Sequence, residues 1–84
     1  LCLADDASTR PDLRRFLDEL PRDPRIKLVR RPANGHICAA TNSAAELATG
    51  EFVAFMDNDD LLAPEALFAF AEALQHQPDV DVLY

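Results

Sequence analysis

The sequence predicts an α/β fold built on a largely parallel sheet, and three observations lead to that prediction. Short apolar runs alternate with longer segments whose apolar residues recur at helical spacing. Short connections containing Pro, Gly or Asn separate these segments. Two of the apolar runs end abruptly in carboxylates, at the position where strands of open α/β sheets bind ligands. The predicted order is strand, helix, strand, helix, strand, helix, strand.

The first predicted strand is Leu1–Ala4, and the helix after it starts near Pro11. Ser8 or Thr9 is the expected cap of that helix, because a hydroxyl can accept a bond from a free amide at the helix start. The apolar face of this helix consists of Leu13, Phe16, Leu17 and Leu20. Pro21 then ends the helix, since proline cannot continue it.

The middle of the chain predicts a second strand, Ile26–Val29, and a second helix from about Ile37 to Ala48. Alanines make this helix narrow, so that it can pack closely on a sheet. The third predicted strand, Glu51–Met56, is apolar enough to be buried on both faces. A third helix starts at Pro64, and Val80–Tyr84 is predicted to form the last strand.

Size and charge exclude several classes of protein. The 84 residues suffice for one small domain, and a net charge of −7 argues against a nucleic-acid surface. The two cysteines, Cys2 and Cys38, form neither a disulfide framework nor a metal motif, so reduced thiols and a cytoplasmic location are predicted. We find no signal peptide and no apolar run long enough to span a membrane. The chain lacks an initial Met and starts inside an apparent strand, so a fragment is expected.

The acidic segment Asp57–Asp60 holds three carboxylates within four residues. Carboxylates packed this closely repel one another, and a hard divalent cation such as Mg²⁺ or Mn²⁺ would neutralise them. The sequence therefore indicates a metal-dependent site for a phosphate-bearing ligand. The alternative is an acidic loop between a strand and a helix, in which Asp60 or a neighbour caps the helix.

A second polar group is expected beside the first strand. Asp5 and Asp6 follow that strand, while Asn34 and Asn42 flank the turn into the second helix. In a doubly wound sheet these strand ends can converge on one crevice. No glycine-rich phosphate loop is present, because Gly35 and Gly50 are the only glycines. Phosphate would then be held by metal and side chains.

These residues resemble the family 2 glycosyltransferases, which have the GT-A fold. The resemblance covers essentially the whole chain in order, through Ala4–Thr9, Asn34–Ile37, Ala39–Asn42, Ala48–Val53, Met56–Asp60 and Pro64. It implies one fragment, residues 1–84, of a nucleotide-sugar-binding domain with a partial, Rossmann-like GT-A sheet flanked by helices. The family's first strand would precede Leu1, and its acceptor half, with the catalytic base, would follow Tyr84.

The resemblance also implies roles for individual residues. Asp5 and Asp6 look like the acidic pair of which one member hydrogen-bonds the base of the donor. Asp57-Asn58-Asp59 looks like the DXD motif, in which the last Asp coordinates Mg²⁺ or Mn²⁺ and the first lies near the metal, ribose or sugar. Asp60 looks like the acid that follows this motif, which is often a structural or sugar-side contact. Asn34 and Asn42 match the two asparagines of the segment before the DXD strand, and both are expected to bind the donor.

Two departures from the family pattern affect these expectations. The usual pattern has glycine at the position of His36, which follows Gly35 here; a turn or surface histidine is the preferred interpretation. The missing first strand would lie between the strands at Leu1 and Phe52. We therefore expect the chain to bridge that gap, to pair with another copy as a homo-oligomer, or to be marginally stable, and to be inactive alone.

The implied function is inverting transfer of a sugar from a nucleotide-diphospho-sugar to a glycan or lipid-linked acceptor. UDP, dTDP and GDP are the donor nucleotides of the family, and bacterial surface polysaccharide synthesis is the expected setting, with membrane association of the longer parent left open. Two alternatives are a non-catalytic nucleotide-sugar or metal-binding module and a structural α/β domain whose acids are only caps. A receiver-like domain is disfavoured, because Lys27 is misplaced for it.

Overall fold

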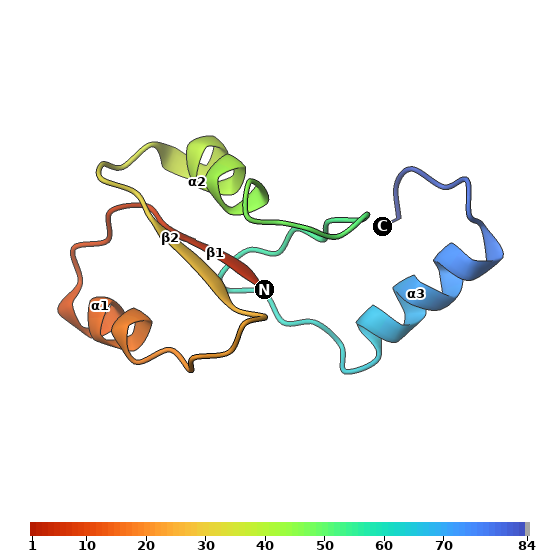
Figure 1. Cartoon of the computed structure of the whole chain (residues 1–84), viewed down its shortest axis with the longest axis horizontal. Coiled ribbons are helices and arrows are strands. Elements are labelled where there is room, and N and C mark those ends of the chain that lie inside the picture. Colours follow the sequence, from red (N-terminus) through yellow and green to blue (C-terminus); the bar gives the residue numbers. More distant parts are fainter. Residues whose placement is uncertain (84) are drawn as a thin grey trace. The chain divides into compact units, whose positions relative to one another are not determined.

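The computed structural model describes residues 1–83 as two compact units, the first covering Leu1–Ala54 and the second beginning at Phe55. Each unit is described separately below. The first contains two strands and two helices in the order β1, α1, β2, α2, and the second contains helix α3 (Figure 1). None of the helices in residues 1–83 has both the length and the apolar character needed to cross a membrane.

The sheet of the first unit consists of two parallel strands, β1 (Cys2–Asp5) and β2 (Lys27–Arg30). Leu3 lies opposite Leu28 and Asp5 lies opposite Arg30 in the ladder. A backbone bond of 2.9 Å from the Arg31 amide to the Asp5 carbonyl extends the pairing by one step. Both predicted strands are therefore confirmed in this part of the chain, and the predicted α/β class with parallel pairing is confirmed with them.

The first helix, α1 (Pro11–Asp18), starts at the predicted proline. Its N-cap is Arg10, whose side chain makes no capping bond, so the expectation that Ser8 or Thr9 caps the helix is wrong. Proline at the first helical position explains why a side-chain cap is dispensable, since proline has no amide hydrogen to satisfy and its φ angle is already helical.

The second helix, α2 (His36–Ala45), packs against both strands of the sheet. It is shorter than predicted: Leu47 and Ala48 bond to the carbonyls of Ala44 and Ala45, which tightens the end of the helix into single turns. The Lys27 ammonium donates to the Leu47 carbonyl at 2.7 Å and so satisfies one of the free acceptors there. Figure 1 shows α1 and α2 on opposite sides of the strand pair.

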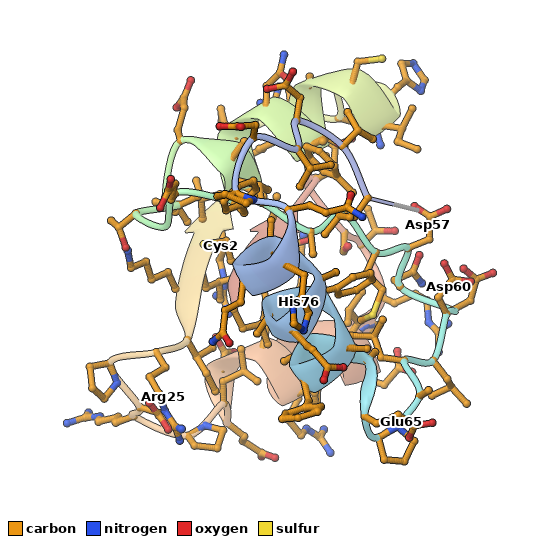
Figure 2. All side chains as sticks on the ribbon, turned by 90° about the vertical axis from the view of Figure 1, so that its right-hand side faces the viewer. Cys2, Arg25, Asp57, Asp60, Glu65 and His76 are labelled. Atoms are coloured by element: carbon orange, nitrogen blue, oxygen red, sulfur yellow. The ribbon has the colours of Figure 1, made fainter. Side chains whose placement is uncertain are left out.

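The second unit carries α3 (Ala66–His76), two residues later than the predicted start at Pro64. Residues 55–65 form a loop that contains the acidic segment. Glu65 and His76 mark the two ends of α3 in Figure 2. Large apolar side chains of this unit are exposed, among them Phe55, Leu61, Leu67 and Phe68.

Two predicted strands are absent from the part of the chain that the structure describes. Glu51–Met56 forms bends and coil with exposed side chains, and Val80–Leu83 forms no strand; Tyr84 lies outside the described residues. A strand requires a hydrogen-bonded neighbour about 4.8 Å away. No strand of residues 1–83 pairs with Glu51–Met56, so its apolar pattern has no ladder to join.

The prediction that Phe55 is buried is also wrong, because its side chain is 73% exposed. We therefore expect Phe55→Ala to change the free energy of unfolding of this chain by no more than about 0.5 kcal/mol, as exposed substitutions usually do. A buried Phe would cost about 3–5 kcal/mol instead. Urea unfolding of the two chains, followed by circular dichroism, measures the difference. A loss in the larger range would contradict the exposed position.

Candidate functional site

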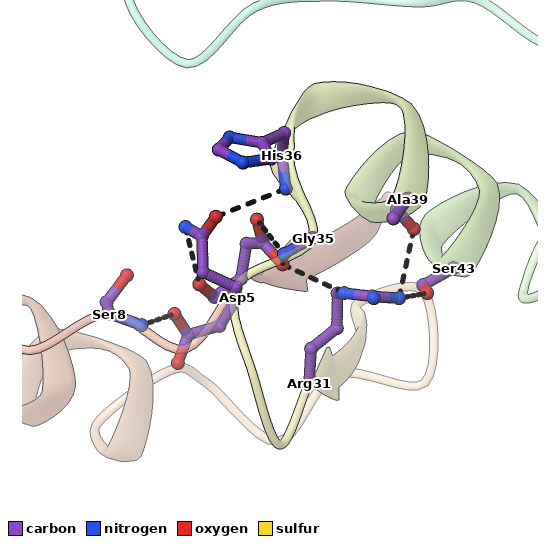
Figure 3. A network of polar contacts seen from close by, with 9 residues as sticks. Asp5, Ser8, Arg31, Gly35, His36, Ala39 and Ser43 are labelled. Atoms are coloured by element: carbon purple, nitrogen blue, oxygen red, sulfur yellow. Dashed lines mark hydrogen bonds and ion pairs between the residues drawn. The ribbon is translucent and has the colours of Figure 1, made fainter.

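The carboxyl ends of β1 and β2 carry a polar network, whose members Arg31 and Gly35 are labelled in Figure 3, and both of these residues bond to Asp6. The Asp6 carboxylate accepts a hydrogen bond from Nε of Arg31 at 2.8 Å and bonds from the Gly35 amide at 2.9 and 3.0 Å. The Asp6 and Arg31 side chains are 18% and 24% exposed, so the ion pair is largely shielded from water. The network joins the turn after β1 to the loop that precedes α2.

Asn34 belongs to the same network. Its Nδ2 donates to the Asp6 carbonyl at 3.4 Å, and its Oδ1 accepts the His36 amide at 3.2 Å. The structure thus brings Asp6 and Asn34 together at one end of the sheet, as the topology predicts. Asn42 is exposed on α2, and no hydrogen bond joins its side chain to another of the residues 1–83.

Asp5 and Asp6 have different hydrogen-bond partners. The Asp5 carboxylate accepts a hydrogen bond from the Ser8 amide at 3.0 Å, within the tight turn that follows β1. Ala7, in the middle of this turn, has a φ of 60°, a left-handed conformation that is uncommon for residues other than glycine. The two neighbouring acids are therefore held separately, Asp5 by its own turn and Asp6 by Arg31 and Gly35.

The pKa of the Asp5 carboxyl is lowered from its ordinary value, first by a hydrogen bond from the Ser8 side chain and then by the Ser8 amide. A carboxyl with a lowered pKa stabilises the fold above its ordinary pKa of about 3.9, and this contribution is lost as the pH falls through the lower, folded value. We expect stability to decrease as the pH falls below about 4. Ser8→Ala keeps the hydrogen bond from the backbone amide of residue 8 and removes the hydroxyl, so the Asp5 pKa should rise toward its ordinary value.

Carboxyl-carbon NMR titration of both chains measures this pKa directly. Thr9→Ala is the matched control, because Thr9 also carries a hydroxyl but is exposed and is not among the groups that shift Asp5. An Asp5 pKa that is the same in Ser8→Ala and in the unaltered chain would contradict the assigned role of the Ser8 hydroxyl.

The structure explains the departure at His36. This residue is exposed and has a φ of 62°, so the backbone there adopts the left-handed conformation that glycine tolerates best. The glycine of the usual pattern fits this backbone requirement. His36 lies at the first position of α2, and its side chain makes no hydrogen bond to another of the residues 1–83, in agreement with its interpretation as a turn residue.

The acidic segment lies in the second unit. Asp57, Asp59 and Asp60 are all exposed, and a backbone bond of 3.2 Å from the Asp60 amide to the Asp57 carbonyl closes a turn. In Figure 2 the labelled side chains of Asp57 and Asp60 extend outward from the loop. Across residues 1–83, no group of three or more His, Cys, Asp or Glu side chains is arranged to hold a metal ion.

Sequence reasoning missed Arg31. The guanidinium also donates from Nη1 to the Ser43 hydroxyl at 2.6 Å and to the Ala39 carbonyl at 3.1 Å. The signal that could have found it is the register: Asp5 lies opposite Arg30, so in a parallel ladder the next two residues, Asp6 and Arg31, also come together.

Comparison with known proteins identifies the family. The family model for glycosyl transferase family 2 matches residues 1–84, which is the whole chain. The chain belongs to glycosyl transferase family 2. The family assignment made from the motifs is therefore confirmed, and the polar network of Asp6 belongs to a family 2 chain. No solved structure matches this family 2 chain.

Curated relatives of this family 2 chain include proteins with named roles. The chain is 46% identical to the uncharacterized protein y4gI of Sinorhizobium fredii, covering 100% of this chain and 9% of that protein. It is 40% identical to the O-antigen biosynthesis protein RfbC of Myxococcus xanthus, covering 98% of this chain and 6% of RfbC. It is 33% identical to a chondroitin synthase of Pasteurella multocida, covering 80% of this chain and 7% of the synthase. The chain thus spans less than a tenth of each of these relatives.

Proposed function

We propose that the protein is an inverting glycosyltransferase of polysaccharide or cell-surface glycan synthesis, and that these residues carry part of its donor site. The observation that carries the proposal is the family match over residues 1–84. The names of RfbC, an O-antigen biosynthesis protein, and of a chondroitin synthase support the polysaccharide setting. The donor is a nucleotide-diphospho-sugar, and the acceptor is a hydroxyl of a glycan or a lipid-linked glycan.

In the first unit, Asp5, Asp6, Asn34 and Asn42 are the proposed donor-binding residues. The contacts of Asp6 support a role in binding the base. Three hydrogen bonds hold its carboxylate, and an ionised carboxylate has about four acceptor positions, so one is left for a ligand. A carboxylate only accepts hydrogen bonds, so it pairs with the ring N–H of uracil, thymine or guanine and is repelled by the lone pair that cytosine and adenine carry at the corresponding ring nitrogen.

In the second unit, Asp59 and Asp57 are the proposed ligands of Mg²⁺ or Mn²⁺, and Asp57 and Asp60 the proposed sugar- or ribose-side contacts. The donor set fits such an ion in type, because exposed carboxylate oxygens are hard ligands. It fits in number as well, since Mg²⁺ is usually bound by one or two carboxylates together with substrate phosphates, and needs no cluster of three.

The divalent ion and the protein would have different roles in sugar transfer. A bound divalent ion supplies Lewis-acid stabilisation of the negative charge that develops on a leaving nucleoside diphosphate. The residues of this chain bind and orient the donor, which lowers the barrier by positioning. Inversion also requires a base that deprotonates the acceptor hydroxyl, and we assign that role to no residue among these 84.

Calorimetric titration of UDP, dTDP and GDP into the chain, with and without Mn²⁺, tests the proposal. Manganese-dependent binding of one nucleotide is the expected result, and it would also identify the base. Equal heats in all titrations of a folded chain would contradict the donor-site proposal for these residues. That outcome would favour the structural alternative, in which Asp5 and Asp6 only stabilise the turn and the loop that they contact.

A further inference from the structure

We propose that Arg31 is a positioning residue that fixes the Asp6 carboxylate for recognition of the donor base; this inference rests on the proposed function. Neither the family match nor the motifs assign a role to Arg31. The three hydrogen bonds of Arg31 reach two segments of the first unit, the turn after β1 and the body of α2, and Asp6 in turn bonds to a third, the loop at Gly35.

The geometry of the guanidinium distinguishes this role from that of a simple counter-charge. Nε donates to Asp6 at 2.8 Å while Nη1 donates to the Ala39 carbonyl and the Ser43 hydroxyl. A planar guanidinium held at both ends cannot rotate, so the direction of its bond to Asp6 is fixed. Lysine has one charged nitrogen and could not serve both ends at once.

Burial makes this constraint effective. The Asp6 and Arg31 side chains are 18% and 24% exposed, so water competes poorly for either of them. The Gly35 amide donates to both Asp6 oxygens, and one acceptor position of Oδ2 stays open for a ligand. Asp6 therefore presents one orientation to a ligand, and removing the Arg31 end of the network would let the carboxylate rotate within the site.

The chain contains a matched control next to this residue. Arg30 also forms an ion pair, with Nη2 at 2.7 Å from Oδ1 of Asp18, but the two side chains are 45% and 61% exposed. Exposed ion pairs contribute little to stability. Arg30→Lys and Arg31→Lys thus make the same chemical change at neighbouring positions, and only the second touches the Asp6 network.

The experiment measures discrimination between bases, which general loosening of the fold would not selectively change. Each nucleotide is paired with one whose base lacks the ring N–H: UDP with CDP, dTDP with dCDP, and GDP with ADP. Calorimetry in Mn²⁺ gives the ratio of the two Kd values for the pair that the unaltered chain prefers. We expect Arg31→Lys to reduce that ratio by about tenfold, the equivalent of one charge-assisted hydrogen bond, and Arg30→Lys to leave it unchanged.

Ser43→Ala is the second variant, since it removes one tether of Nη1 and leaves the bond between Arg31 and Asp6 in place. We expect a smaller reduction of the same ratio, with circular dichroism unchanged. The inference is overturned if Arg31→Lys and Ser43→Ala both keep the ratio of the unaltered chain, or if that chain binds both members of each pair equally. Absence of all nucleotide binding by the folded, unaltered chain would instead overturn the proposed function.

Discussion

Asp59→Asn is expected to weaken manganese-dependent nucleotide binding by at least about tenfold while leaving the fold intact. Loss of residues that only support metal ligands costs about 10–100-fold in affinity, and loss of a charged ligand should cost no less. The fold should survive because Asp59 is exposed and makes no ion pair with any of the residues 1–83. Removing one charge also relieves repulsion from Asp57 and Asp60.

Calorimetric titration with and without Mn²⁺ measures the effect, and circular dichroism checks the fold. Asp81→Asn is the matched control, because Asp81 is an exposed acid of the same unit outside the acidic segment. If Asp59→Asn and the control bound the nucleotide with equal manganese-dependent affinity, Asp59 would not be a metal ligand. Unfolding of Asp59→Asn would show a structural role for the residue.

Gly35→Ala is expected to have the largest effect on stability, a loss of about 1–3 kcal/mol from overpacking. A Cβ atom at this position would lie 2.6 Å from Nη2 of Arg31 and 2.8 Å from Cβ of Ala39. Arg31 cannot easily move aside, because hydrogen bonds to Asp6 and α2 hold its guanidinium. Ala39 is part of α2, so relief would require the helix to shift from the sheet.

Urea unfolding followed by circular dichroism measures this loss. Gly50→Ala is the control. Its Cβ would meet the backbone of Phe52, with the carbonyl oxygen at 3.2 Å and the amide nitrogen at 4.0 Å, in a segment without regular structure, and its φ is not positive. We expect a change within about 0.5 kcal/mol there. If Gly35→Ala and Gly50→Ala had the same free energy of unfolding, the loop at Gly35 would have to adapt, and the Asp6 network would not be tightly packed.

The elements that the sequence predicted correctly are those whose requirements are met within residues 1–83. Pro11 sets the start of α1, and the apolar runs at Leu1 and Ile26 become β1 and β2, because each has the other as a neighbour in the ladder. The run at Phe52 has an equally strong strand pattern, yet it forms no strand. Its strand character depends on a partner that the chain does not supply in residues 1–83, and composition alone cannot show that.

The candidate site shows the same division. The meeting of Asp6 and Asn34 was predictable, because the ends of parallel strands share one edge of the sheet. The bonds from Arg31 to Ala39 and Ser43 were not, since they depend on how α2 is placed against the sheet. The roles of Asp5, Asp6, Asn34, Asn42, Asp57, Asp59 and Asp60 in donor or metal binding remain predictions.

The partial exposure of every residue among 1–83, none of which is fully buried, has a calorimetric consequence. The heat-capacity increase on unfolding comes mainly from hydrating apolar surface that the fold had hidden, and here none of the apolar residues among 1–83 is fully hidden. The stability curve should therefore be unusually flat with temperature, and the slope of unfolding free energy against denaturant should be small for a chain of this length. A polypeptide segment or ligand that covers Phe52–Met56 would increase the curvature of stability with temperature and the denaturant slope. The steepness of melting therefore indicates whether this segment is covered.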